Sequence, residues 1–165
     1  MRIALGADHA GVELKAHVKQ LLDELRVPYR DFGSLNNDSV DYPDFAARVA
    51  KEVASGEFDR GILVCGSGLG MAIAANKIRG IRAVPVSDVE SARLAREHND
   101  ANVLALGGRM TPIDRAREIV RVFLETPFAG GRHQRRIDKI TEIELNGGLP
   151  PSPQTSTPAS AKKDT

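Results

Sequence analysis

The sequence predicts an α/β protein with a doubly wound sheet of five parallel strands and helices on both faces. Short apolar runs alternate along the chain with segments in which apolar residues recur every three or four positions. Runs of the first kind are typical of strands, and segments of the second kind are typical of amphipathic helices. Residues 61–65 are apolar throughout, as expected of a parallel strand buried on both faces. The alternation therefore predicts three layers with the sheet in the middle.

The first half of the chain holds three of the expected strands, at residues 2–5, 29–32 and 61–65. After the first strand comes a helix whose apolar face comprises Leu14, Val18, Leu21, Leu22 and Leu25. The second strand ends in a polar loop, after which Pro43 opens a helix, a place in the first turn that proline tolerates. The apolar residues of that helix, four apart, are Phe45, Val49 and Val53.

The second half repeats the alternation, which makes the whole Rossmann-like. Glycine-rich residues lead into a helix that reaches about residue 78, and strands are expected at 81–86 and 103–106 with a helix at 88–98 between them. Two helices close the domain, at about 112–125 and 131–145. The residues of the first that we expect to face inward are Ile113, Ala116, Val120 and Phe123.

Length and composition limit the possible functions. A chain of 165 residues, with 41% hydrophobic and 27% charged residues, suits one globular domain. The net charge is only +1, which disfavours a general binder of nucleic acid or of a membrane surface. No apolar run approaches the roughly 18 residues of a membrane span, and Asp8-His9 leaves no room for a signal peptide. We therefore expect a cytoplasmic protein.

Two further features bound the domain and its cofactors. The single cysteine makes no internal disulfide, and no Cys/His spacing resembles a zinc site, so we expect neither metal nor cofactor. Residues 147–165 are rich in Pro, Ser and Thr and hold Leu149 as their one large apolar side chain. Such a segment buries too little surface to offset its ordering entropy. We expect a domain at 1–146 and a disordered tail.

Chemistry-bearing residues follow the expected strands. The segments concerned are Gly6-Ala7-Asp8-His9, Cys65-Gly66-Ser67-Gly68, Ser87-Asp88 and Gly107-Gly108-Arg109. In open parallel sheets, ligands bind outside the carboxyl ends of the strands. We therefore expect these segments to converge on one crevice.

The strongest local signal is the glycine-rich segment 65–70 between a strand and a helix. Glycines let the backbone approach a ligand, and the helix N-terminus offers unpaired N–H groups to an anion. The spacing is not the dinucleotide fingerprint, and the lysine of a P-loop is absent. A purely structural turn is an equal alternative. Cys65 is either a small buried hydrophobe or a thiolate favoured by the helix dipole, and Ser67 either caps the helix or contacts a ligand.

His98 and a basic cluster near the C-terminus also have two interpretations. His98 ends a helix, where its charge is favourable, and it could also act as a general acid and base near neutral pH. Arg132 and Arg136 share one helix face and suit a phosphate or carboxylate, although a solvated basic helix start is the simpler alternative. Arg109 is a third candidate for an anion.

These residues together resemble a known family. The motifs that carry the resemblance, over residues 1 to about 145, are Gly6-x-Asp8-His9-x-Gly11, Asp41-Tyr42-Pro43, Cys65-Gly66-Ser67-Gly68-x-Gly70, Ala74-Ala75-Asn76-Lys77, His98-Asn99-Asp100-x-Asn102 and Gly130-Gly131-Arg132-His133. The chain is similar to the type B ribose-5-phosphate isomerases, in a family that also includes galactose- and allose-6-phosphate isomerases. The resemblance implies an aldose–ketose isomerase of phosphorylated sugars that needs no metal or cofactor. It also implies active sites at a homodimer interface, with a tetramer left open.

The resemblance further implies roles for individual residues. Cys65 is expected to remove the C2 proton, since this chain lacks the glutamate that some members carry in place of Met71. The enediolate oxygens would be held by Ser67 and the amides of Gly66, Gly68, Leu69 and Gly70. His98 would assist ring opening, and Asp8 and Asn99 would bind sugar hydroxyls. The expected phosphate-side residues are His9, Arg109, Arg132 and Arg136, the last two from either subunit.

The chemistry agrees with this set of residues, because moving a proton between C1 and C2 needs a base, donors for the developing oxyanion and a way to open the ring. The favoured reaction interconverts ribose 5-phosphate and ribulose 5-phosphate, a step of the pentose phosphate pathway. Two alternatives stay open: a six-carbon sugar-phosphate isomerase with a roomier pocket, and a non-catalytic sugar-phosphate sensor in which Cys65 only packs.

Overall fold

The computed structural model describes residues 1–148 and confirms the predicted sheet. Its five strands are parallel and lie in the order β2-β1-β3-β5-β4. Their bounds are β1 Ile3–Ala7, β2 Tyr29–Asp31, β3 Arg60–Cys65, β4 Ala83–Pro85 and β5 Val103–Gly107. β1 and β3 lie in the interior of the sheet, so the residues that follow them open at its centre.

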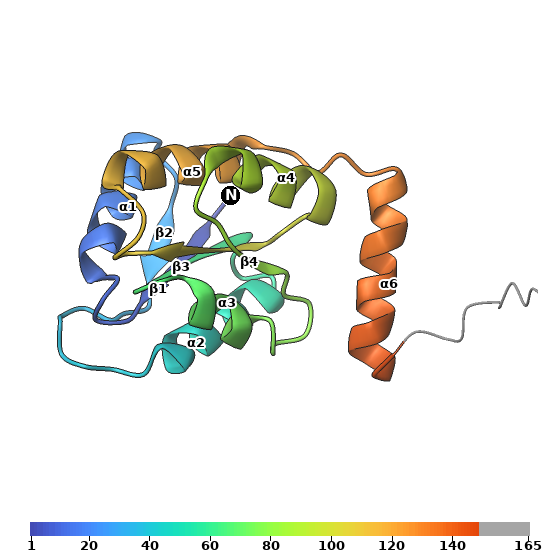
Figure 1. The fold of residues 1–165 in the computed structure, drawn as a ribbon, viewed down its shortest axis with the longest axis horizontal. Helices are drawn as coiled ribbons and strands as arrows, with labels where there is room; N and C mark the ends of the chain where they lie inside the picture. The colour runs from blue at the N-terminus through green and yellow to red at the C-terminus, as the bar shows by residue number, and fades with distance from the viewer. Residues whose placement is uncertain (149–165) are drawn as a thin grey trace, which may run out of the picture.

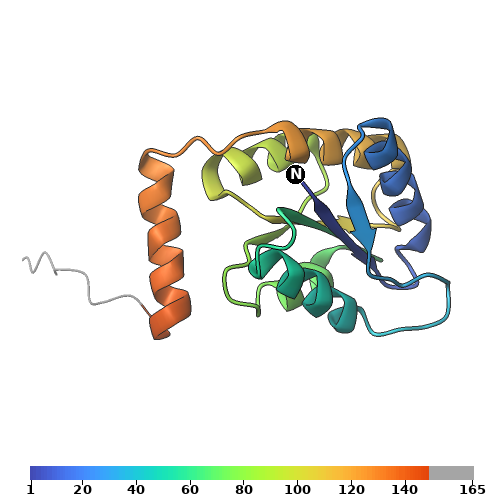
Figure 2. The same ribbon diagram turned by 180° about the vertical axis from the view of Figure 1, so that it is seen from behind.

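Residues 1–148 form six helices, five of which pack on the sheet (Figure 1). Their bounds are α1 Val12–Glu24, α2 Tyr42–Ala54, α3 Leu69–Ala75, α4 Val89–Asn99, α5 Ile113–Glu125 and α6 Arg132–Asn146. α1, α4 and α5 cover one face, and α2 and α3 cover the other, as the reverse view also shows (Figure 2). α6 stands apart from these three layers, upright at one side of the molecule.

The strands send alternate side chains into two separate cores. Leu5, Ile62 and Leu104 pack under α1, α4 and α5, whereas Leu63 and Cys65 pack with the residues of α2 and α3. This alternation follows from the period of two in a strand. It directs the Cys65 side chain towards the α2–α3 side of the sheet.

The boundaries differ from the sequence predictions at three places. α3 ends at Ala75 because the Asn76 side chain pairs with the backbone of Ala83, with bonds of 2.8 and 2.7 Å. β4 is correspondingly shorter than the predicted strand. The prediction for Ile113 was wrong: this residue is 37% exposed, because it begins α5 and the inward face starts one turn later at Ala116.

The described residues end just after α6. α6 ends at Asn146, and its cap Gly147 donates from its amide to the Ile143 carbonyl. The tail predicted to be disordered lies outside the described residues from residue 149 on, so its disorder stays a prediction. Among residues 1–148, no helix combines the length and the apolarity that crossing a membrane would require.

The loops after β1, β3 and β5 contact one another through their backbones. The Asp8 amide donates to the Val64 carbonyl, and the Gly108 amide donates to the Cys65 carbonyl at 2.7 Å. A Cβ added at Gly11 would lie 2.3 Å from the Val64 oxygen, and one at Gly108 would lie 2.6 Å from the Ala10 oxygen. Neither contact leaves room for a side chain.

The Gly11 contact gives a first prediction. Gly11→Ala forces the α1 N-terminus away from β3, and we expect the free energy of unfolding to fall by about 1–3 kcal/mol, typical of overpacking. Denaturant unfolding at fixed protein concentration measures the change. Gly148→Ala is the control, because a Cβ there meets no atom within 4 Å. Equal stability of the two variants would contradict the prediction.

Candidate active site

A cleft of about 410 Å³ opens at the carboxyl edge of the sheet. Its lining residues are Asp8, Tyr42, Cys65, Gly66, Ser67, Gly70, Arg109 and Met110. They come from the loops that follow β1, β3 and β5 and from the start of α2. The predicted convergence on one crevice is therefore confirmed for the segments after the first, third and fifth strands. It was wrong for Ser87-Asp88, which does not line this cleft, because Asp88 caps α4 by accepting from the Ser91 amide.

Cys65 is the last residue of β3 and lies at the floor of this cleft. Its side chain is 4% exposed, and its Sγ accepts a hydrogen bond of 3.2 Å from the Gly68 amide. This bond fixes the sulfur beside the N-terminus of α3. Gly68 makes it by adopting a left-handed conformation, φ 80°, that places its backbone close against Leu106.

Ser67 and Gly70 occupy the same loop. The Ser67 hydroxyl does not cap α3, whose N-cap is Gly68, and it accepts only a long bond of 3.4 Å from the Leu69 amide. This hydroxyl is exposed at the cleft. A Cβ at Gly70 would lie 2.6 Å from the Tyr42 ring, so the absence of a side chain there makes room for that ring.

Asp8 holds its own loop and keeps one oxygen for a ligand. Its Oδ1 accepts from the amides of Ala10 and Gly11 at 2.9 and 3.1 Å. The side chain is only 7% exposed. Among the described residues the hydrogen bonds of this carboxylate use Oδ1, so Oδ2 is the oxygen left for a ligand at the cleft.

Arg109 lines the cleft, and His9 follows Asp8 in the loop after β1. The His9 Nδ1 accepts a hydrogen bond of 3.3 Å from the Val40 amide, which leaves Nε2 for a ligand. Arg109 is exposed, and its amide donates to the Gly66 carbonyl at 3.1 Å, which ties it to the cysteine loop. Both side chains suit an anion, as predicted from sequence.

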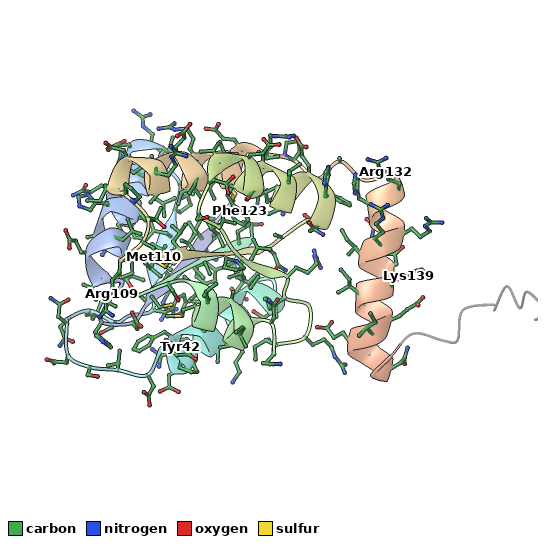
Figure 3. The ribbon with its side chains drawn as sticks, in the orientation of Figure 1. Tyr42, Arg109, Met110, Phe123, Arg132 and Lys139 are labelled. Carbon is green, nitrogen blue, oxygen red and sulfur yellow. The ribbon has the colours of Figure 1, made fainter. Side chains whose placement is uncertain are left out.

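Two lining residues had no role in the sequence analysis. Tyr42 begins α2 and reaches across to the cysteine loop, and Met110 follows Arg109 and is 70% exposed (Figure 3). The motif Asp41-Tyr42-Pro43 was a signal for the first of them. For Met110 the sequence carried no signal, because an isolated methionine is usually read as a core residue.

A buried ion pair fixes the loop that carries Val40. Lys15, 3% exposed, donates from Nζ to Asp31 Oδ1 and to the Ser34 carbonyl, both at 2.6 Å. Burial alone would raise the pKa of Asp31, but the hydrogen bonds from Lys15, Gly33 and Lys19 hold this pKa below its usual value. The loop from Ser34 to Val40 is therefore anchored at Ser34. Its other end contacts His9 through the Val40 amide.

The remaining predicted residues, His98, Asn99, Arg132 and Arg136, do not line this cleft. α4 runs antiparallel to the strands, so His98 and Asn99 lie at the amino edge of the sheet, opposite to the edge at which Cys65 lies. Arg132 begins α6 on the opposite side of the molecule from Arg109 (Figure 3). A single copy of the chain therefore holds two separate clusters.

The second cluster is firmly held. Asp100, in a left-handed conformation at the end of α4, accepts from Arg82 at 3.0 Å and from Arg96 at 2.8 Å. Arg82 also donates to the Asn99 carbonyl. The His98 ring stacks on the His133 ring of α6, with centroids 4.2 Å apart. Within residues 1–148, no group of three His, Cys, Asp or Glu side chains is placed to bind a metal ion.

Comparisons with known proteins agree on one family. The Ribose/Galactose Isomerase family model matches residues 3–140. The chain is 48% identical to ribose-5-phosphate isomerase B of Escherichia coli over 143 residues, covering 87% of this chain and 96% of that protein. It is 43% identical to ribose-5-phosphate isomerase B of Mycobacterium tuberculosis over 155 residues, covering 93% and 96%.

Solved structures give the same result. Ribose-5-phosphate isomerase B of Clostridium thermocellum superposes with a TM-score of 0.88 at 50% identity, covering 90% of this chain and 100% of that one. The enzyme of Mycoplasma genitalium, solved with bound ribulose-5-phosphate, has a TM-score of 0.84 at 41% identity, covering 88% and 97%.

The Asp31 pair generates a prediction for acid conditions. The carboxylate has a lowered pKa in the folded state, so its stabilisation is complete above the unfolded pKa of about 3.9 and is lost as the pH falls through the folded value. Asp31→Asn should cost about 3–5 kcal/mol at pH 7, because Lys15 stays buried without its partner. The gap to wild type should narrow below about pH 4.

Urea unfolding at pH 7, 5, 4 and 3 measures this gap. Asp138→Asn is the control, since Asp138 is exposed on α6 and pairs only with Gln134 among the described residues. A gap for Asp31→Asn that stays constant from pH 7 to pH 3 would show that the carboxylate's charge is not what stabilises the fold.

Proposed function

The chain belongs to the ribose/galactose isomerase family, and we propose that it interconverts D-ribose 5-phosphate and D-ribulose 5-phosphate through a cis-enediolate, with Cys65 as the base and no metal ion. The observation that carries the proposal is the Cys65 sulfur at the floor of the cleft, hydrogen-bonded by the Gly68 amide. As an aldose–ketose isomerase of the pentose phosphate pathway, the protein is an enzyme rather than a sensor. The proposal places it in the cytoplasm, where sugar phosphates are used.

The reaction begins with ring opening. The O1 hydroxyl of the furanose loses its proton, the C1–O4 bond breaks, and O4 gains a proton. A single imidazole can carry out both transfers near neutral pH. His98 is the candidate for this step, because the resemblance of the chain to the family implies that role.

Proton transfer then takes place at the cleft. The Cys65 thiolate removes the C2 proton, the C2–H electrons form the C1=C2 bond, and O1 takes up the negative charge. The thiol returns the proton to C1 on the same face, while the O2 proton passes to O1, which yields ribulose 5-phosphate. Each N–H donor placed where this charge develops is typically worth about 3–4 kcal/mol in the transition state.

The residues around Cys65 fit the rest of the substrate. Gly66, Ser67 and Gly70 line the cleft beside Cys65. In the proposal, O1 and O2 lie on this side, against the Ser67 hydroxyl and the amides of residues 66–70. Asp8 Oδ2 would accept a sugar hydroxyl, with His9 and Arg109 at the phosphate end. The phosphate is remote from the reacting carbons, so its binding energy orients them without taking part in the chemistry.

A second copy of the chain would supply His98, Asn99, Arg132 and Arg136. These residues lie too far from Cys65 to act in the same copy, and a two-fold axis would bring the amino-edge cluster of one copy to the cleft of the other. Exposed apolar side chains support this homodimer. They are Leu69 and Ile73 on α3 and Ile140, Ile143 and Leu145 on α6.

The identity of the base gives the first test of the proposal. Cys65→Ala should lower kcat for ribose 5-phosphate by about 10²–10⁴-fold in buffer containing EDTA, because the variant lacks the thiol to which the proposal assigns removal of the C2 proton. Formation of ribulose 5-phosphate measures the rate, and Ser55→Ala, at the opposite edge of the sheet, is the control. Near-wild-type turnover in Cys65→Ala would exclude the thiolate as base. Turnover of allose 6-phosphate alone would identify a six-carbon isomerase.

The shared site gives the second test. Cys65→Ala and His98→Ala should each be inactive alone, but a mixed dimer contains one site with an intact Cys65 and an intact His98. Random mixing of equal amounts should therefore restore about a quarter of the wild-type activity. The two proteins are unfolded together, refolded and assayed with ribose 5-phosphate. Activity no higher than that of the separate variants would refute a site shared between copies.

A further inference from the structure

The imidazole of His98 stacks on that of His133, a residue to which the reaction described above gives no role. Their centroids are 4.2 Å apart and their planes are inclined by 9°. His98 lies in the last turn of α4, and His133 lies in the first turn of α6. The bend between α5 and α6 is tied to the same place, because the Ala129 amide donates to the Glu97 carbonyl at 3.0 Å.

The two rings differ in their surroundings. His133 is only 7% exposed. The charged and titratable groups that face it are Glu97 and His98 on α4 and Arg132 and Arg136 on α6. Burial, followed by these three cationic groups, lowers the pKa of His133, whereas Glu97 acts in the opposite direction.

A neutral His133 has a definite effect on its neighbour. Two stacked imidazoles repel each other strongly when both are positively charged, so the pair carries at most one positive charge. Contact between the two parallel ring faces fixes the plane of the His98 ring. The stack thus limits the motion of His98 without occupying either of its ring nitrogens by a hydrogen bond.

We propose that His133 is the positioning residue for His98, holding the ring-opening imidazole by stacking and joining it to the arginine-bearing helix α6 as one unit. The inference rests on the proposed function, in which His98 opens the sugar ring. Its consequence is that ring opening and phosphate binding are aligned within a copy before that copy meets its partner's cleft. Misalignment of a catalytic group by about 1 Å can cost on the order of 10²-fold in rate.

The test separates ring opening from proton transfer. Ribose 5-phosphate is a furanose and needs its ring opened, whereas ribulose 5-phosphate is open-chained, because the phosphate blocks its 5-hydroxyl from closing a ring. Loss of deuterium from ribulose 5-phosphate labelled at C1 therefore reports proton transfer by Cys65 alone. We compare His133→Ala and His133→Phe with wild type, and His17→Ala on α1 is the control, since it removes a histidine with no role in the site.

For His133→Ala we expect kcat with ribose 5-phosphate to fall about tenfold, with KM and the deuterium loss within about twofold of wild type. For His133→Phe, which keeps a stacking ring but cannot titrate, we expect kcat within about twofold of wild type. Circular dichroism and sedimentation first establish equal folding and equal dimer fractions, and rates are expressed per dimer.

Three outcomes would overturn the inference. They are equal losses of turnover and of deuterium exchange in His133→Ala, a loss in His133→Phe as large as that in His133→Ala, and a wild-type rate per dimer in His133→Ala. Failure of the proposed function would look different, since the wild-type protein would then neither convert ribose 5-phosphate nor exchange the label of ribulose 5-phosphate.

Discussion

The backbone-to-backbone contact between the loops after β1, β3 and β5 is the constraint on which the rest of the structure depends. Gly11 lies against the Val64 carbonyl, and Gly108 lies against Ala10, so the first and fifth strands hold the end of the third from both sides. These backbone contacts, rather than interactions of the side chains themselves, determine where Cys65, Asp8 and Arg109 lie. A reacting carbon must meet a base within a few tenths of an ångström, and close-packed backbone supplies that precision.

The division of the chemistry between two clusters follows from the direction of the chain. Each strand leads into the following segment at the carboxyl edge of the sheet, so Cys65, the last residue of β3, lies at that edge. α4 runs back in the opposite direction, so its end, with His98, lies at the amino edge. The amino-edge cluster is held as firmly as the cleft, because Asp100 is bound by two arginines and His98 is covered by His133. Each copy thus presents the proposed base, Cys65, at one edge and His98 with Arg132 and Arg136 at the other.

Much of this could be predicted from the sequence, and the reasons for the exceptions are physical. Strands and buried helix faces follow from apolar periodicity, and the order Cys65-Gly66-Ser67-Gly68 after a continuous apolar run predicts a site at a strand end. Tyr42 was missed because its place in the cleft depends on how α2 packs against the cysteine loop, which no local pattern encodes. Ile113 was placed on an inward face because periodicity does not say on which turn burial begins. The roles of His98 and Arg132 came only from resemblance, since neither residue lines the cleft of its own copy.

The glycine contacts under the cleft also set which positions are free to vary. A floor made of main chain cannot be reshaped by exchanging side chains, so random libraries directed at residues 11, 68 or 108 would mostly return unfolded protein. Variation that changes the cleft while preserving the scaffold is confined to its walls, where Tyr42 and Met110 stand in solvent. Substitutions in the cleft walls can therefore change the shape of the cleft while the main chain around Cys65 stays the same. The proposed proton transfer would be retained, and the residues around it could vary in evolution.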